Sequence, residues 1–416
     1  MSTGRSKESQ SGRSGTNLPQ LADLNGAVVL GWIRRSSAGL SRVELAQTTG
    51  LSPQAVSNIC QRLLDDGMIM EAGKTTSGFG KPRTLLTLDP TGCYAVGVHL
   101  DPTVVTIVLL DFVGTVVART ALTTAAADPP AELVATIGRL VDGLIDDAGI
   151  VRDRVLGIGI ASPGPIDPVS GTVLHPPLLT NWHNVPLRDQ LKAATGLPAL
   201  LDKDVIAAAV AERWAGEALQ SRNFAFIYLG AGIGAGLVVD DVVVRGTSAN
   251  AGDIGEFEVA GPDGLGTTYL GEMANPEPIL SQAARAGVFP SVPRKDDPLA
   301  VDEYFTELCG RADAGDARAA AILDQAAVRI GGAVARIANL LDIDTVVFGG
   351  TTWSRVADRY LATMAGIIQA GSITSDIHPI RVVGTGLGED VGAIGAACLV
   401  LDTKASTQPG RTLQTF

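Results

Sequence analysis

Residues 41–67 read SRVELAQTTGLSPQAVSNICQRLLDDG, and this stretch carries the signals for two short helices joined by a tight turn. Ser41 and Glu44 have the spacing of a capping box, in which each side chain satisfies a backbone amide of the other residue. Gly50 suits the left-handed residue that ends a helix. Ser52, followed by a proline, supplies an N-cap and a favourable first residue for the next helix. The stretch therefore predicts a helix-turn-helix.

The second of these helices has an apolar face and a polar face. The apolar side chains repeat at helical spacing and are expected to face inward; they are Val56, Ile59, Cys60 and Leu63. The opposite face carries polar side chains that can hydrogen-bond the edges of DNA bases. The residues that we predict to contact DNA here are Gln54, Ser57, Asn58 and Arg62 of this helix, Ser52 at its start and Arg42 of the helix before it.

A basic, glycine-rich segment follows the two helices. Residues 68–71 and 84–88 have the pattern of two strands, and they flank the sequence GKTTSGFGKPR at 73–83. Such a hairpin is typical of the wing of a winged helix, whose cations contact phosphates or the minor groove. The candidate cations are Lys74, Lys81 and Arg83. A helical dimerisation module with an accidental basic loop is the alternative, but the caps, the wing and a third helix predicted at 24–38 agree on the winged helix.

The charge of the chain is unevenly distributed. The whole sequence of 416 residues has a net charge of −12. Residues 1–90 hold ten basic and seven acidic groups, whereas the remainder holds 22 basic and 37 acidic groups. A mildly basic head on an acidic body fits a nucleic-acid-binding module attached to a sensor or an enzyme, although an ordinary solvated surface would give the same charge.

Cysteine usage and hydropathy limit the classes further. The four cysteines lie far apart, which excludes a disulfide framework and a cysteine-based zinc ribbon and suits a reducing cytoplasm. The first residues have no apolar core, and no apolar run reaches about 18 residues, so we expect neither a signal peptide nor a membrane span. The sequence predicts a soluble cytoplasmic protein.

From about residue 92 the pattern changes to that of an α/β body. Strands are expected at 94–100, 104–111 and 115–119, and a second trio at 224–229, 235–240 and 242–245. Each trio is followed by helical sequence, for example at 131–147. Two similar modules of this kind predict a duplicated α/β unit with a cleft between two lobes.

Five glycine-containing segments of the body carry a resemblance to a known family. They are GIGIASPGPID at 157–167, LGAGIGAG at 229–236, AGDIG at 251–255, VFGG at 347–350 and GLGEDVG at 386–392. In this order and behind a winged helix, they resemble the ROK family of repressors, open reading frames and sugar kinases, and more narrowly its transcriptional regulators. The resemblance implies an α/β chain with an N-terminal winged helix-turn-helix, followed by a two-lobed actin-like, ribonuclease-H-like ATPase fold of the sugar-kinase type.

This resemblance also implies a domain division. We expect a disordered tail at 1–19, the winged helix at 20–90 and a ROK domain at 91–402, with a loose tail at 403–416. Within the ROK domain, lobe 1 covers about 91–210, lobe 2 about 211–390 and a closing helix about 388–402.

The phosphate loop of the family's kinases is altered in this chain. Those kinases place ATP with an early Asp-x-Gly-Gly-Thr loop, and the corresponding stretch here is His99-Leu100-Asp101-Pro102-Thr103. Pro102 removes an amide donor, and Asp101 puts a carboxylate where a polyphosphate would lie, so the two like charges repel. We therefore expect that ATP binding is lost and that no cofactor is needed.

The sugar site is altered as well. The family's Asn-Asp pair appears as Lys203-Asp204, with Asp204 at the position of the general base, and its Glu-x-Gly-His appears as Asp253-Ile254-Gly255-Glu256. The cysteine motif that holds the family's zinc is missing from 261–272, so we expect no metal site. The candidate effector-binding residues are Lys203, Asp204, Asp253, Glu256 and Glu272. The alternative is that these carboxylates are surface or capping groups.

Together these features predict a cytoplasmic transcriptional regulator, a repressor of carbohydrate-related genes. Its partners would be double-stranded operator DNA, a sugar or sugar-derivative effector and further copies of itself in a homodimer or homotetramer, with no membrane partner. Two alternatives remain open at this point. One is a sugar kinase, phosphorylating hexoses or N-acetylhexosamines, that has kept a DNA-binding head. The other is an architectural DNA-binding protein whose body binds no small molecule.

Overall fold

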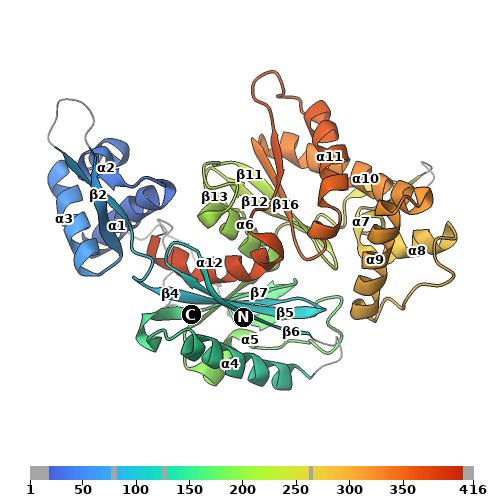
Figure 1. Cartoon of the computed structure of the whole chain (residues 1–416), viewed down its shortest axis with the longest axis horizontal. Helices are drawn as coiled ribbons and strands as arrows, with labels where there is room; N and C mark the ends of the chain where they lie inside the picture. Colours follow the sequence, from blue (N-terminus) through green and yellow to red (C-terminus); the bar gives the residue numbers. More distant parts are fainter. Residues whose placement is uncertain (1–17, 76–81, 124–128, 262–265, 406–416) are drawn as a thin grey trace, which may run out of the picture.

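The computed structural model of the protein describes residues 18–75, 82–123, 129–261 and 266–405. A small N-terminal head projects from one end of a larger two-lobed body (Figure 1). None of the helices in these ranges is both long and apolar enough to cross a membrane.

The head consists of three helices packed on a small antiparallel sheet in the order β1-β3-β2. Its elements are α1 (Leu18–Arg35), β1 (Leu40–Ser41), α2 (Arg42–Thr49), α3 (Pro53–Asp65), β2 (Ile69–Thr75) and β3 (Arg83–Leu88). The capping box at Ser41 and Glu44 is present, and Gly50 ends α2 with a φ of 70°. The Ser52 hydroxyl accepts a hydrogen bond from the Ala55 amide, 3.2 Å away. The predicted winged helix-turn-helix is therefore confirmed.

The boundaries of the head differ in detail from the prediction. α1 begins at Leu18, which is six residues before the helix predicted at 24–38 and within the tail predicted at 1–19. Pro19 lies in the first turn of α1, where a proline is compatible with a helix. β2 extends beyond residue 71 to Thr75. The tip of the wing at 76–81, including Lys81, lies outside the described residues, as do residues 1–17 and 406–416.

Lobe 1 of the body is built on a five-stranded sheet with the strand order β10-β7-β4-β5-β6. The strands are β4 (Tyr94–Leu100), β5 (Val104–Asp111), β6 (Val116–Thr123), β7 (Val155–Ser162) and β10 (Ala199–Lys203). Helices α4 (Pro130–Asp147) and α5 (Leu187–Thr195) cover one face, and a small hairpin is formed by β8 (Ile166–Asp167) and β9 (Thr172–Val173).

Lobe 2 repeats this plan with the strand order β13-β12-β11-β16-β17. Its strands are β11 (Phe224–Leu229), β12 (Ile233–Val239), β13 (Val242–Val243), β16 (Thr345–Gly349) and β17 (Arg381–Gly384). In each lobe, three antiparallel strands are extended by two parallel ones. The predicted duplication of an α/β unit is thus visible in the topology.

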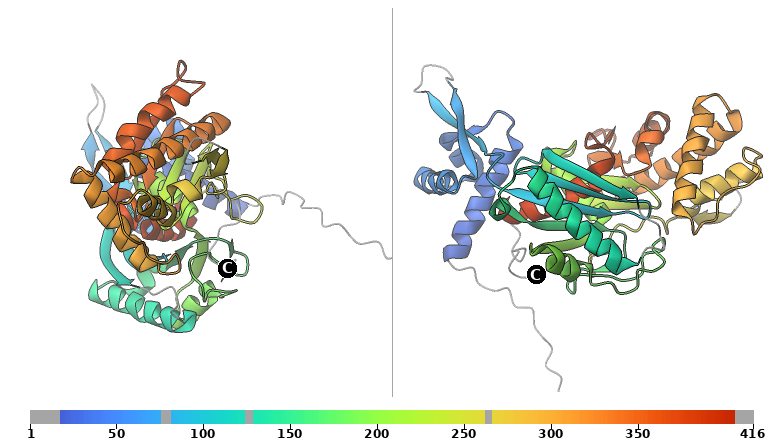
Figure 2. Two further views of the ribbon diagram at one scale, coloured as in Figure 1. Left: turned by 90° about the vertical axis from the view of Figure 1, so that its right-hand side faces the viewer. Right: turned by 60° about the horizontal axis from the view of Figure 1, so that its bottom comes forward.

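The other elements of lobe 2 cover its outer face and its far end (Figure 2). They are β14 (Glu258–Ala260), β15 (Thr267–Tyr269), α7 (Gly271–Ala274), α8 (Pro276–Arg285), α9 (Pro298–Asp313), α10 (Ala317–Leu341) and α11 (Ala357–Gly371).

Two helices, α6 (Asp204–Ala215) and α12 (Val391–Ala405), form a layer between the two sheets (Figure 1). Each crosses to the other lobe: α6 follows the last strand of lobe 1 but packs on β12, and α12 follows lobe 2 but packs on β4 and β7. Glycines permit this contact, since a Cβ atom at Gly236 would lie 2.1 Å from the Val205 carbonyl oxygen and one at Gly159 only 1.7 Å from that of Ala396. α6 and α12 touch equally closely, because a Cβ at Gly395 would lie 2.0 Å from the Ala207 carbonyl oxygen.

Candidate DNA-binding face and interlobe site

The polar face of α3 points to solvent. Val56, Cys60 and Leu63 are buried in the head, while Gln54, Ser57 and Asn58 are exposed on the opposite side. The Gln54 Nε2 donates a hydrogen bond to the Asn58 Oδ1 at 3.0 Å, so the two amides form one exposed polar surface near the N-terminus of the helix. This is the part of a recognition helix that enters the major groove in helix-turn-helix proteins.

The predicted cations of the head differ in their placement. Lys74 and Arg83 are exposed on the two wing strands, whereas Arg42, the first residue of α2, is half-buried. Arg62 is exposed but leans against α1, because a Cβ at Gly26 would lie 2.9 Å from its Nη2. Exposed positive charge therefore lies on both wing strands and, with Arg62, at the end of α3.

In the body, the junction of β10 and α6 brings Lys203 and Asp204 to the space between the lobes. The Lys203 Nζ donates to the Asn250 carbonyl oxygen at 3.4 Å, and its side chain lies over Gly164. The Asp204 Oδ1 accepts from the Val205 amide at 2.7 Å. Burial raises the pKa of the Asp204 carboxyl, and the neighbouring His99 and Lys203 partly oppose that shift.

The other predicted effector residues continue outward from this junction. Gly252 packs against Val205 in the first turn of α6, which places Asp253 next to it at the edge of the site. The Gly271 amide in turn donates to the Gly255 carbonyl at 2.8 Å, which joins the segment carrying Glu256 to α7, where Glu272 lies. Asp253, Glu256 and Glu272 are all exposed. The inner part of the site therefore consists of Lys203 and Asp204.

His99 and Asp101 were expected only as residues of an altered phosphate loop. In the structure both side chains lie inside the interlobe site. His99 is 1% exposed, and its ring lies edge-on to Tyr228 of lobe 2 at a centroid distance of 6.1 Å. The ring also contacts Gly392 at the start of α12, and its Nε2 has no hydrogen-bond partner among the described residues. The signal that could have identified this position is a histidine at the end of a strand that is otherwise wholly apolar.

Asp101 is a second buried polar residue, in the loop that follows β4. It is 4% exposed, and its Oδ1 accepts from the Thr103 amide at 3.0 Å and from the Thr103 hydroxyl at 2.7 Å. Burial and the nearby charges of Asp101 and Asp204 hold the pKa of Tyr228 well above its usual range. Asp101 therefore puts a buried carboxylate into the loop between β4 and β5.

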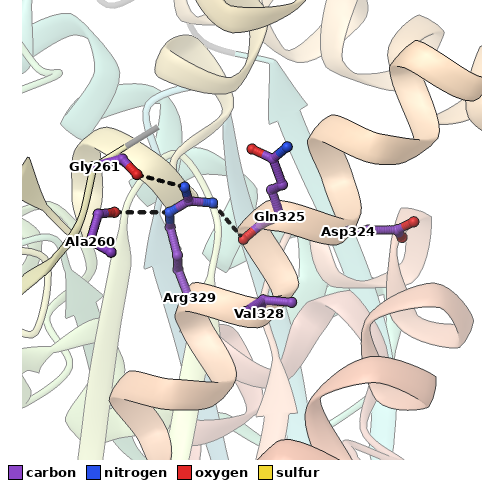
Figure 3. Close-up of a pocket in the computed structure, with 6 residues that line it drawn as sticks. All are labelled: Ala260, Gly261, Asp324, Gln325, Val328 and Arg329. Carbon is purple, nitrogen blue, oxygen red and sulfur yellow. Dashed lines mark hydrogen bonds between the residues drawn. The ribbon is translucent and has the colours of Figure 1, made fainter. Parts of the chain in front are cut away.

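A separate hollow lies on lobe 2 between β14 and α10 (Figure 3). It is lined by Ala260, Gly261, Asp324, Gln325, Val328 and Arg329. The Arg329 guanidinium donates to the carbonyl oxygens of Ala260 and Gly261 at 3.0 and 2.9 Å, and Asp324 pairs with Arg359 at 3.0 Å. The two charged groups of this hollow, the Arg329 guanidinium and the Asp324 carboxylate, are therefore already bound to other groups of the protein. In the part of the chain that the structure describes, no group of three His, Cys, Asp or Glu side chains is arranged to hold a metal ion.

Comparison with known proteins agrees with this architecture. The family described as ROK matches residues 95–403, and a family described as winged helix-turn-helix DNA-binding matches residues 35–70. A putative xylose repressor from Caldicellulosiruptor sp. (strain Rt8B.4) is 25% identical over 372 residues, covering 87% of this chain and 92% of the relative. A glucokinase from Halalkalibacterium halodurans is 29% identical over 325 residues, covering 76% of this chain and 97% of the relative.

The fold has a close counterpart among solved structures. The crystal structure of a ROK family transcriptional regulator, a homologue of the E. coli MLC protein, matches with a TM-score of 0.72 at 23% identity. The match covers 93% of this chain and 98% of the other, so both the head and the body are included.

Proposed function

The chain belongs to the ROK family, and we propose that it acts as a DNA-binding transcriptional regulator, a repressor of carbohydrate-related genes. The observation that carries this proposal is the exposed polar surface of Gln54, Ser57 and Asn58 on a capped recognition helix, beside a wing with exposed Lys74 and Arg83. Amide side chains suit base edges and the cations suit phosphates. The repressor role is supported by the similarity to a putative xylose repressor. Such a protein would work in the cytoplasm, as a symmetric dimer or tetramer on a two-fold operator.

In this proposal the body is a sensor that has lost kinase chemistry. The loop that resembles the phosphate loop of the family's kinases carries the buried carboxylate of Asp101 and the buried ring of His99. A polyphosphate entering there would meet a like charge in a desolvated place, which costs several kcal/mol. A sugar kinase with a DNA-binding head remains the second candidate, favoured by the similarity to a glucokinase.

The effector that we propose is a sugar or a sugar derivative bound near Lys203 and Asp204. A carboxylate and an ammonium that converge in one place can hydrogen-bond hydroxyl groups. The cation of Lys203, which is 8% exposed, favours an acidic sugar or a sugar phosphate over a neutral hexose. Isothermal titration calorimetry with neutral and anionic sugars on the wild type and on Asp204→Ala tests this placement. Binding that survives Asp204→Ala unchanged would place the effector elsewhere.

The DNA-binding function is tested by selecting genomic fragments with the full-length protein and measuring their affinity by gel shift. We expect a small set of fragments that share a two-fold symmetric sequence and bind at least about a thousandfold more tightly than random duplex. Equal affinity for selected and random fragments would contradict a sequence-specific regulator. The genes beside the selected fragments then indicate which sugars to use in the calorimetry.

A further inference from the structure

The DNA-binding head is fixed to the body through the last turn of α1. The Arg34 Nη1 donates to the carbonyl oxygens of Arg213 and Trp214, at 2.7 and 2.8 Å. These carbonyls belong to the last turn of α6, where a helix has no partners of its own for its C=O groups and favours a cation. The same guanidinium lies over the Trp214 ring, 4.6 Å from its centroid. Burial lowers the pKa of Arg34 to about 10, which still leaves it charged at physiological pH.

Further contacts surround this one. Arg35 pairs with Asp241 in the turn between β12 and β13, and the Gln220 Nε2 donates to the Arg35 carbonyl oxygen at 3.1 Å. The buried apolar side chains of the head form one continuous cluster with those of α6 and α12. Trp214 is 2% exposed and also contacts Phe112 and Gly114 of lobe 1. The head is therefore packed against the interlobe layer without a separating gap.

The opposite end of the same helix reaches the interlobe site. α6 begins at Asp204, directly after Lys203, and its 12 residues span about 18 Å. Every residue from Val205 to Trp214 is buried. The backbone contacts with Gly236 and Gly395 leave no space for α6 to bend or to slide without its neighbours. A displacement of the first turn of α6 would therefore also displace its last turn.

We propose that α6 is a rigid connection between the interlobe site and the DNA-binding head. In this proposal Arg34 is the positioning residue, because it binds the C-terminal end of α6 and so couples the head to that helix. The proposal rests on the proposed regulatory function for what happens at the Asp204 end. In the docked arrangement Arg34 fixes the angle of the head to the body, and in a dimer that angle sets the spacing of the two recognition helices. A shift of α6 with its neighbours by about 1–2 Å, the usual size of helix shifts in allosteric proteins, would move the two carbonyl groups that Arg34 holds and so change that angle.

The first test is hydrogen exchange followed by mass spectrometry on the full-length protein, without DNA or effector. Asp204→Asn perturbs one end of α6, and Arg34→Lys keeps the charge at the other end but removes the planar group that spans two carbonyls. We expect Asp204→Asn to change the exchange rate of amides at 30–35 by about threefold or more in the wild-type background and not in the Arg34→Lys background. A change confined to the first turns of α6, or one that is equal in both backgrounds, overturns the proposal.

The matched control is Arg329→Lys. This arginine also donates to two backbone carbonyls, but it lies on α10 away from α6, so it should leave the response at 30–35 to Asp204→Asn intact. Loss of that response in Arg329→Lys would mean that any such substitution abolishes it, and would overturn the specific role of Arg34.

The second test measures DNA binding with a selected genomic fragment and with a random duplex of equal length. Arg34→Lys should weaken binding to the selected fragment by about fivefold and binding to random DNA by less than twofold, because only the operator requires a fixed spacing. The double variant Arg34→Lys/Asp204→Asn tests whether the two residues are coupled. Its change in affinity for the selected fragment should differ by more than about twofold from the product of the changes in the two single variants, although residues so far apart are ordinarily independent. Independent effects would overturn the proposal. Failure to select any fragment would refute the regulatory function alone and leave the exchange test to decide.

Discussion

The guanidinium of Arg213 on α6 forms an ion pair with the carboxylate of Asp402 on α12, with 2.8 Å between Nη2 and Oδ2. Both side chains are about 10% exposed, and Arg213 also donates to the Asp241 carbonyl oxygen at 2.9 Å. The pair thus joins the two helices of the interlobe layer at the end that supports the head. The Asp402 carboxylate also acts on the buried guanidinium of Arg34, so it compensates two buried cations.

We expect Asp402→Leu to destabilise the protein by about 3–5 kcal/mol, because it leaves the Arg213 charge buried without its partner. The double variant Arg213→Met/Asp402→Leu should recover only part of that loss, because the buried Arg34 still lacks the charge of Asp402. Urea unfolding followed by tryptophan fluorescence measures the change. Arg294→Ala, which breaks a pair exposed to solvent, is the control and should leave the midpoint unchanged. A wild-type midpoint for Asp402→Leu would show that the pair is not needed.

The recognition helix and the wing should respond differently to substitution. Replacing Asn58 by Ala should weaken operator binding by about 1–3 kcal/mol and binding to random DNA much less, because base contacts carry the sequence information. Gln61→Ala is the matched control, because it removes a similar exposed hydrogen bond, from the Gln61 amide to the Asp65 carboxylate, at the far end of α3. Gel-shift titrations on both DNAs measure the effect. Equal losses on both DNAs for Asn58→Ala would contradict the assignment of this helix.

For the wing, Arg83→Ala should weaken operator and random DNA to a similar extent. Phosphate contacts release counterions regardless of sequence, so the variant should also lower the slope of log affinity against log salt concentration by about one. Titrations between 50 and 200 mM salt measure that slope. An unchanged slope would exclude a phosphate contact by Arg83.

Purified protein should not phosphorylate hexoses or N-acetylhexosamines with ATP. The reason is the loop from His99 to Thr103, in which buried side chains take the place of amide donors. A coupled assay for ADP over a panel of sugars measures the rate. Turnover above about 1 s⁻¹, an ordinary low rate for an enzyme, would support the kinase alternative instead.

The head shows how much of a fold local sequence can predict. The caps at Ser41, Gly50 and Ser52 act over three or four residues, so their geometry follows from spacing alone. The contact of Arg34 with the end of α6 joins positions 179 and 180 residues apart. No periodicity encodes such a contact, and Arg34 is one of two basic residues in the last turn of α1. The docking of the head could therefore be seen only in the structure.

The interlobe site shows the same limit. The resemblance predicted that Asp204 lies in a cleft, and the glycines that allow α6 and α12 to cross were recognisable only as family motifs. That the His99 ring lies between Gly392 and Tyr228 depends on both lobes meeting. The sequence left open whether these carboxylates line the site or lie at the surface, and Asp253, Glu256 and Glu272 are exposed.

Asp204 should reduce the stability of the protein at neutral pH. Burial raises the pKa of its carboxyl in the folded state, so the folded protein holds this proton more tightly than the unfolded chain does. The stabilisation that comes from this tighter proton binding is fully present below the ordinary pKa of an aspartate. It is lost as the pH rises through the raised pKa of the folded state. A retained group that costs stability is typical of a functional site.

We therefore expect Asp204→Asn, which cannot ionise, to be more stable than the wild type at pH 7.5, with the difference shrinking as the pH falls toward 4.5. Urea unfolding of both proteins at several pH values measures this difference. Asp316→Asn is the contrasting control, because its carboxylate caps α10, has a lowered pKa and accepts from the amides of Arg318 and Ala319. That variant should be less stable than the wild type at pH 7.5. If Asp204→Asn is also less stable there, the interactions of the Asp204 carboxylate with its neighbours outweigh its desolvation, and the carboxylate is a structural partner of those neighbours rather than a group held ready for a ligand.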